Sequence, residues 1–88
     1  SVDLSKFGLT DESTEWIPWK WWSQVQRIDL RGNQLTRIPH GLSVVNSNCQ
    51  IFLQGNPLNS FDLSFISNQS RLHQYLGGIA SASSLPLP

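Results

Sequence analysis

The sequence has almost no cysteine, and this scarcity excludes one class of small protein. Only Cys49 is present among the 88 residues. A single cysteine cannot form an internal disulfide, whereas small secreted domains usually carry even sets of paired cysteines. We therefore expect a fold that needs no disulfide, and a reducing compartment such as the cytoplasm.

Excess charge and long apolar runs are missing as well. Six basic and six acidic residues give a formal net charge of +0 at pH 7. Because a phosphate backbone is held by a basic surface, nucleic acid is not expected as a partner. No apolar run approaches the roughly 20 residues of a membrane span. No basic region followed by an apolar one marks a signal peptide. A membrane is therefore not expected as a partner either.

Motifs for metals, cofactors and catalysis are also absent. One cysteine and two separated histidines, His40 and His73, do not make a tetrahedral metal site. The turns RGNQ and QGNP are not phosphate-binding loops, and no serine lies in a nucleophile elbow. Cys49 lies beside an apolar strand pattern, where a small buried hydrophobe is the common role. We expect no catalytic residue, no metal, no cofactor and no enzyme activity in this chain.

What the chain does have is an internal repeat. Three stretches align, reading SVDLSKFGLT from residue 1, RIDLRGNQLT from residue 27 and QIFLQGNPLN from residue 50. We call them the first, second and third copies. The offset is 26 residues from Val2 to Ile28 and 23 residues from Ile28 to Ile51. The apolar positions that recur in register are Val2, Leu4 and Leu9, then Ile28, Leu30 and Leu35, then Ile51, Leu53 and Leu58.

Each copy begins with apolar residues that alternate with other residues, which is the spacing of a β-strand. The expected strands lie near residues 1–5, 26–31 and 49–54. Stacked in parallel, such short strands would satisfy one another's backbone groups. Their apolar side chains would then share one inner side and form a core.

The turn after each strand carries a second signal. Asn33 and Asn56 take the same position in the second and third copies. An amide side chain has both donors and an acceptor, so it can bond backbone groups that the sheet leaves unpaired. The first copy has Phe7 there. Its ring is expected to fill the space without bonding the backbone, which a terminal repeat tolerates better than an internal one.

The repeat resembles the leucine-rich repeat family, whose pattern is L-x-x-L-x-L-x-x-N/C-x-L with a period of about 20–29 residues. The resemblance is best for residues 25–58. The residues of VQRIDLRGNQLTRIPHGL that fit the pattern are Val25, Ile28, Leu30, Asn33 and Leu35. The resemblance implies an α/β fold, a short leucine-rich-repeat solenoid of about three parallel strands. It further implies an asparagine ladder, irregular or helical convex segments and a C-terminal helical cap.

In such a solenoid, the strand residues that face away from the core form one continuous concave surface. Here that surface mixes arginine, aspartate, glutamine and one aromatic residue. Arginine and aromatic side chains contribute most of the energy at protein interfaces. The family binds protein partners through this concave face. The candidate partner-binding residues are Arg27, Asp29, Arg31, Gln50, Phe52 and Gln54.

All four tryptophans lie in EWIPWKWWSQ, residues 15–24. Acidic residues before this segment suit a helix start, and Pro18 interrupts any helix through it. On a helical turn Trp19 and Trp22 share a face, so Trp22 and one of Trp16 or Trp19 are expected in the core. Exposed neighbouring indoles would favour association, so a homo-oligomer remains open. The candidate oligomer interface is Trp16, Trp19 and Trp21.

The repeat pattern of residues 1–58 stops after the third copy. Residues 59–78 are expected to form helical turns that cap the last strand, as terminal repeats require, and to end at Gly77-Gly78. The candidate helix starts are Ser60, Asp62, Asn68 and Ser70. Residues 79–88, IASASSLPLP, are expected to be a disordered tail.

A second resemblance rests on NSNCQIFLQGNPLNSFDLSFI, residues 46–66. This stretch resembles the last repeat of bacterial type III secreted effectors of the novel E3 ubiquitin ligase group. The residues that carry it are Cys49, Ile51, Leu53, Asn56, Pro57 and Leu58. It implies a virulence protein secreted into a host cytoplasm, whose repeats bind the substrate or hold a catalytic domain inactive. The repeats here are longer than is usual in that group. Its Cys-x-Asp nucleophile motif is not matched, because Gln50 and Ile51 follow Cys49.

We therefore expect a non-catalytic module that binds a protein partner through the concave face. Two alternatives remain open. One is the substrate-recognition domain of a secreted bacterial ubiquitin-ligase effector. The other is an oligomerising structural fragment of a larger leucine-rich repeat protein.

Overall fold

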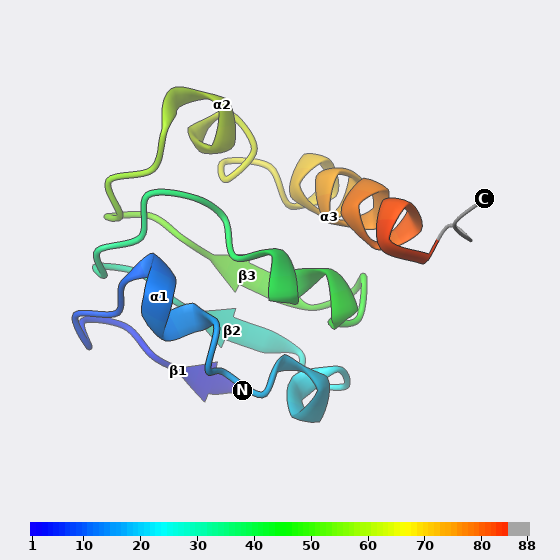
Figure 1. Cartoon of the computed structure of the whole chain (residues 1–88), viewed down its shortest axis with the longest axis horizontal. Coiled ribbons are helices and arrows are strands. Elements are labelled where there is room, and N and C mark those ends of the chain that lie inside the picture. Colours follow the sequence, from blue (N-terminus) through cyan, green and yellow to red (C-terminus); the bar gives the residue numbers. More distant parts are fainter. Residues whose placement is uncertain (85–88) are drawn as a thin grey trace.

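The residues at the start of each copy, where apolar and other side chains alternate, form a strand in the computed structural model. The structure describes residues 1–84. The strands are β1 (Val2–Asp3), β2 (Arg27–Asp29) and β3 (Gln50–Phe52). They form one parallel sheet in the order β1-β2-β3, with β1 at one end and α2 and α3 beyond β3 (Figure 1). The fold is a small α/β domain with a three-stranded parallel sheet and a C-terminal helix.

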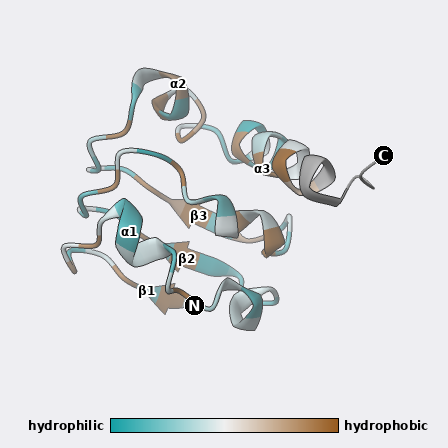
Figure 2. Ribbon diagram, in the orientation of Figure 1, coloured by the Kyte–Doolittle hydropathy of each residue, from teal (hydrophilic) through white to brown (hydrophobic). Residues whose placement is uncertain are grey.

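The register of the sheet follows the alignment of the three copies. Val2 lies opposite Ile28, and Ile28 lies opposite Ile51. Asp29 lies between Asp3 and Phe52 in the next column. Because side chains alternate between the two faces of a strand, the aligned apolar column faces the core on all three strands. Figure 2 shows hydrophobic residues on each strand. The predicted register is confirmed.

The core belongs mainly to the second and third copies. Its apolar positions there are fully buried or nearly so: Ile28, Leu30, Leu35, Ile51, Leu53 and Leu58. The equivalent residues of the first copy, Val2, Leu4 and Leu9, are only partly buried against the core. The sheet therefore has one well-covered end and one poorly covered end.

Short helical segments return along one side of the sheet. The first is α1 (Asp11–Thr14), whose N-cap Thr10 forms a capping box with Ser13. The second is the 3₁₀ helix η1 (Trp19–Trp22), which begins after Pro18. The expected break at Pro18 is confirmed, because a proline cannot donate the backbone hydrogen bond that a continuous helix needs. A further 3₁₀ helix, η2 (His40–Val44), leads towards β3.

Trp19 is buried within this layer of short helices and has 8% of its surface exposed. Its Nε1 donates to the Thr14 carbonyl at 3.1 Å, and its ring meets that of Trp22 edge to face at 5.7 Å. The indole packs directly on Gly41, where a Cβ would lie 2.0 Å from Trp19 Cδ1. Trp19 therefore belongs to the core, which corrects its assignment to a candidate interface. Trp16 and Trp21 remain exposed, at 88% and 82%.

Asn33 joins the second copy to the first. Its Oδ1 accepts from the Phe7 and Leu9 amides at 2.9 and 3.0 Å. Its Nδ2 donates to the Leu4 and Leu30 carbonyls, both at 2.9 Å. The predicted bonding of this turn asparagine to backbone groups is confirmed. Each polar group is satisfied at a buried place where water cannot replace it.

Asn56 repeats the arrangement one copy later. Its Oδ1 accepts from the Leu35 amide at 3.1 Å. Its Nδ2 donates to the Leu30 and Leu53 carbonyls at 2.9 Å. Phe7, in the same position of the first copy, does not fill the equivalent space as expected, because 67% of its surface is exposed. Among the described residues no preceding copy lies beside this position, so the ring has no partner to pack against there.

The chain after the third copy forms α2 (Ser60–Leu63) and α3 (Gln69–Ser84). Asn59 caps α2 through its side chain, rather than Ser60 or Asp62. The predicted end at Gly77-Gly78 is wrong, because α3 continues through these glycines to Ser84. Residues 79–84 are helical, which corrects the expected disordered tail there. Residues 85–88 of that prediction lie outside the described residues.

We predict that Asn33→Ala lowers the free energy of unfolding by about 2–4 kcal/mol, because several buried backbone groups lose their partner. Denaturant unfolding followed by circular dichroism measures this. The neighbouring exposed Gln34 supplies the control, since Gln34→Ala should stay within about 0.5 kcal/mol of the parent. Equal losses for the two variants would contradict the structural role given to Asn33.

We predict that Gly41→Ala displaces the Trp19 ring and costs about 1–3 kcal/mol, as overpacking does. Tryptophan emission should shift to the red as the indole gains solvent. Gly77 is a matched control, because a Cβ there meets nothing within 4 Å. Gly77→Ala should stabilise α3 by about 0.5–1 kcal/mol. An unchanged emission spectrum in Gly41→Ala would show that the tight contact is not maintained.

Candidate functional site

The six candidate partner-binding residues lie on β2 and β3 or just after them, at positions that alternate with the core-facing residues. Gln50 lies opposite Arg27, and Phe52 lies opposite Asp29. The Arg27 and Arg31 side chains are each 49% exposed. We call this set, Arg27, Asp29, Arg31, Gln50, Phe52 and Gln54, the strand face. The sequence prediction that these residues share one surface agrees with the strand register.

Asp29 organises the strand face electrostatically. Its Oδ1 accepts from the Arg31 amide at 3.1 Å and from Arg31 Nε at 2.9 Å, while Arg31 Nη2 donates to Oδ2 at 2.6 Å. Arg27 Nη2 lies 3.8 Å from the same oxygen. The hydrogen bonds from the Arg31 side chain lower the pKa of the Asp29 carboxyl, although burial opposes them. A nearly buried carboxylate thus binds Arg31 directly and attracts Arg27.

Phe52 is half-buried between the two arginines. Arg27 Cζ lies 4.9 Å from the centre of its ring, and Arg31 Cζ lies 5.6 Å from it. These are cation–π distances, at which a guanidinium is attracted to the face of an aromatic ring. The arginines therefore shield part of the ring while their own charge remains at the surface. We call Arg27, Phe52 and Arg31 the arginine–phenylalanine stack.

The stack was not foreseen from the sequence, although a signal for it exists. Arg27, Asp29 and Arg31 lie at every second position, so their side chains share one face of the strand. Aligning the copies places Phe52 beside Asp29. Together these two rules put both guanidiniums next to the carboxylate and the ring. The distances themselves depend on side-chain rotamers, which a pattern does not give.

Gln54 is less available than the other strand-face residues. Its Nε2 donates to the Ile66 carbonyl at 3.3 Å, which ties it to the segment between α2 and α3. Its role is at least partly structural. The arginine–phenylalanine stack and Gln50 are therefore the main exposed groups of the strand face.

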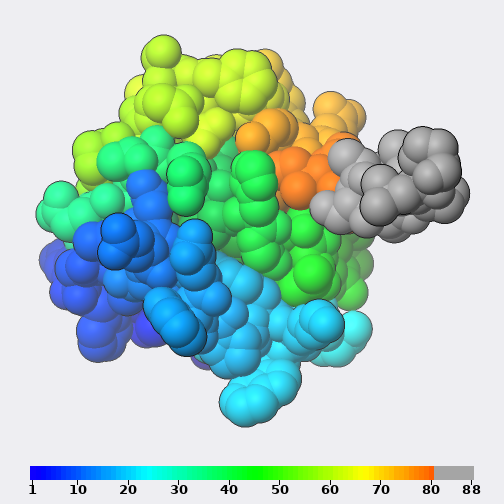
Figure 3. Space-filling view, in the orientation of Figure 1, coloured from blue at the N-terminus to red at the C-terminus, as the bar shows by residue number. Residues whose placement is uncertain are grey.

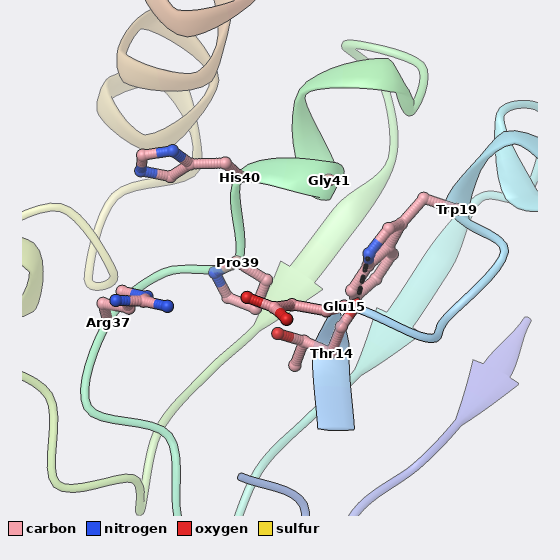
Figure 4. Close-up of a pocket in the computed structure, with 7 residues that line it drawn as sticks. All are labelled: Thr14, Glu15, Trp19, Arg37, Pro39, His40 and Gly41. Carbon is pink, nitrogen blue, oxygen red and sulfur yellow. Dashed lines mark hydrogen bonds between the residues drawn. The ribbon is translucent and has the colours of Figure 1, made fainter. Parts of the chain in front are cut away.

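A hollow lies elsewhere, between the short helical segments. It encloses about 560 Å³ and is lined by Thr14, Glu15, Trp19, Arg37, Pro39, His40 and Gly41. Figure 4 shows Arg37 and His40 on one side of the view and Trp19 on the other, with Glu15 and Pro39 between them. No hydrogen bond or ion pair joins Glu15, Arg37 and His40 in the described part of the chain. The hollow is open and its charged groups do not converge on a common point.

A second hollow, of about 410 Å³, adjoins the first across Trp19 and Gly41. Its walls are almost wholly apolar and include the exposed Trp21 and Val44. The cyan segment that contains η1 stands out from the surface at the bottom of Figure 3. The tryptophan segment thus offers an apolar surface on the side of the molecule opposite the strand face.

The remaining candidate chemistry is limited. Cys49 is buried, and desolvation raises the pKa of its thiol, so the nucleophilic thiolate is disfavoured. Residues 1–84 contain no cluster of three or more side chains able to hold a metal ion. Within the same residues, no helix combines the length and apolar character that crossing a membrane requires.

Comparison with protein families, curated proteins and solved structures finds no match to this chain.

We predict that Asp29 makes stability depend on pH in acid. Its folded-state pKa lies below the ordinary value of 3.8, so its contribution is fully present above that pH. The contribution is lost as the pH falls through the lower, folded-state pKa. The difference in unfolding free energy between the parent and Asp29→Asn should therefore shrink below about pH 4. Unfolding at a series of pH values measures it.

Asp3→Asn is the matched comparison for this experiment. The Asp3 carboxylate is exposed and accepts from the amide and hydroxyl of Ser5 rather than from a guanidinium. This substitution should change the pH profile less than Asp29→Asn. If both variants alter the profile equally, the bonds from Arg31 are not the cause of the Asp29 effect.

Proposed function

We propose that this chain is a leucine-rich-repeat module that binds a protein partner through the strand face. The observation that carries the proposal is the arginine–phenylalanine stack. Arginine and aromatic side chains are the residues that most often dominate binding energy at protein interfaces. Here the arginines are exposed and packed against the half-buried Phe52, and Asp29 binds Arg31 directly, so less side-chain entropy remains to be lost on binding.

The three stacked copies and their two bonded asparagines support the family part of the proposal. In-register parallel strands, glycine turns and buried turn asparagines are what the leucine-rich repeat resemblance implies. The short strand face is small for a stable interface. A partner is therefore expected to contact the face through a few anchoring residues, with acidic or aromatic groups against the exposed guanidiniums.

A second candidate is the substrate-recognition domain of a secreted bacterial ubiquitin-ligase effector. The observation that favours it is the run from Asn56 through Pro57 and Leu58 into α2, which Asn59 caps. This is the order of strand, turn and capping helix that the second resemblance implies. The gene sequence beyond Pro88 tests it, since a stop codon there would remove this candidate.

We predict that a photo-reactive residue at Gln50 cross-links a partner, while the same residue at Gln74 does not. Both glutamines are exposed, but Gln50 lies on the strand face and Gln74 on α3. The cross-linked protein is then purified and its affinity measured by calorimetry. Equal cross-linking from both positions would contradict the proposed face.

The affinity measurement uses single substitutions in the stack. Arg27→Ala and Phe52→Ala should each weaken binding by at least about tenfold, a loss of about 1.4 kcal/mol. Arg71→Ala is the control, because Arg71 Cζ lies 5.5 Å from the Phe65 ring in a similar contact away from the face. Circular dichroism checks that each variant is folded. An Arg27→Ala protein that binds as tightly as Arg71→Ala would refute the proposal.

A further inference from the structure

The two edges of the sheet are finished in different ways. At the β3 edge, Gln69 Oε1 accepts from the Ile51 amide at 3.0 Å, and Gln69 Nε2 donates to the Ile51 carbonyl at 2.7 Å. His73 Nε2 lies 2.6 Å from the Cys49 carbonyl, which accepts from it. Side chains of α3 thus take the hydrogen bonds that a further strand would make. This edge is closed.

The β1 edge has no such cover among the described residues. Figure 1 shows β1 at the end of the sheet, with no labelled element beyond it. Val2, Leu4 and Leu9 are only partly buried, and Phe7 is exposed. An edge strand with apolar neighbours and unpaired backbone groups is a template for pairing with another strand.

A further copy of the repeat does not fit on this edge in the same register. The asparagine bonds run in one direction, because Asn33 bonds the first copy and Asn56 bonds the second. The first copy would have to bond a preceding copy in the same way. Phe7 stands in that position and has no polar side-chain group to offer. A preceding turn would therefore be left with unpaired backbone groups.

Gly32 and Gly55, which take the same position in the second and third copies, support the same conclusion. A Cβ on Gly55 would lie 3.2 Å from the Gly32 amide nitrogen, and one on Gly32 would lie 3.1 Å from Lys6 Cγ. Side chains at this position therefore point at the preceding copy. Lys6 occupies it in the first copy, in the left-handed region with φ 59°. Its Cβ would crowd the backbone of a copy stacked before it, as a Cβ on Gly55 would crowd Gly32, although its Cγ turns back toward Gly32.

We propose that the β1 edge pairs antiparallel with the β1 edge of a second copy of this chain. An antiparallel partner does not place a turn against Lys6 and Phe7 in the way a stacked repeat does. The interface is isologous, so it uses the same surface on both protomers. Because the β3 edge is closed, such pairing ends at a dimer and does not continue into a fibre. Two strand faces would then lie on one six-stranded sheet.

Backbone direction limits the register of this pairing. The Leu4 amide donates inward to the Asp29 carbonyl at 2.8 Å. Alternation therefore turns the Asp3 amide and the Ser5 carbonyl outward. Asp3 opposite its own equivalent would set two carboxylates face to face, which is unfavourable. Asp3 opposite the partner's Ser5 avoids this and joins the outward Asp3 amide to the outward Ser5 carbonyl, while the Ser5 amide keeps its bond to Asp3 Oδ1 of its own chain at 3.0 Å. The two-fold axis then passes beside Leu4.

Leu4 would face its own equivalent as a pair without direct hydrogen bonds, with Cα atoms about 4.5 Å apart. That separation suits a disulfide. In a Cys49→Ala background, Leu4→Cys should form a covalent dimer on mild oxidation. Val2→Cys and Asp3→Cys are matched controls that report pairings in which the two-fold axis passes beside those residues instead. Preferential cross-linking of either control would overturn the proposed pairing.

Solution mass over a dilution series gives the second test. The parent should change from twice the monomer mass of 9.9 kDa to that mass on dilution. Asp3→Pro removes the outward amide, which an edge strand tolerates, and should raise the dissociation constant at least tenfold. Asp3→Ala loses the same carboxylate but keeps the amide, and should dimerise much more tightly than Asp3→Pro. A parent that stays monomeric up to about 1 mM, or equal dimerisation of both variants, would overturn the proposal.

Discussion

The hydrogen bonds of the two turn asparagines are the interaction on which the rest of the structure depends. Strands of two or three residues make too few ladder bonds to fix their own stacking. Asn33 and Asn56 add bonds to backbone groups that the short strands leave unpaired. They act at buried sites, where an unmade bond is costly. Glycine at the preceding position lets neighbouring turns approach closely enough for these bonds to form. Stacking, register and core burial therefore share one cause, which is the fit of an amide into the turn of the preceding copy.

The strand face is a consequence of that stacking. In-register parallel strands bring residues of equal position into columns, whatever their chemistry. The core needs its columns to be apolar, whereas the opposite face has no such requirement. There Asp29 and Phe52 come to lie side by side, and the two arginines on β2 and just after it gather around them. The result is a charged and aromatic surface that is ordered without being buried. Such order favours binding, because the side chains are already held in one arrangement.

What the sequence predicted well depends on local patterns or on repetition. The strand register follows from aligning the copies, and the bonding of Asn33 and Asn56 follows from their position after the strand. The break at Pro18 follows from the chemistry of proline. What the sequence did not reveal depends on contacts between distant segments. Trp19 is buried because Gly41 leaves room for its indole, and α3 continues past Gly77-Gly78 into Ser84 although glycine usually weakens a helix. The same applies to the arginine–phenylalanine stack, whose residues were identified but whose contacts were not.

The closed edge and the stacked turns use the same chemistry in different places. A primary amide presents a donor and an acceptor on neighbouring atoms, as a peptide group does. Asn33 and Asn56 use it to join one copy to the next, and Gln69 uses it to complete the backbone of Ile51 where the copies stop. The first copy offers no amide in the corresponding position, since Lys6 and Phe7 occupy its turn. One end of the sheet is thus finished by a side chain that imitates a strand. In residues 1–84, the other end keeps the outward Asp3 amide beside partly covered apolar residues, and a strand supplied by another molecule would pair with the one and cover the others.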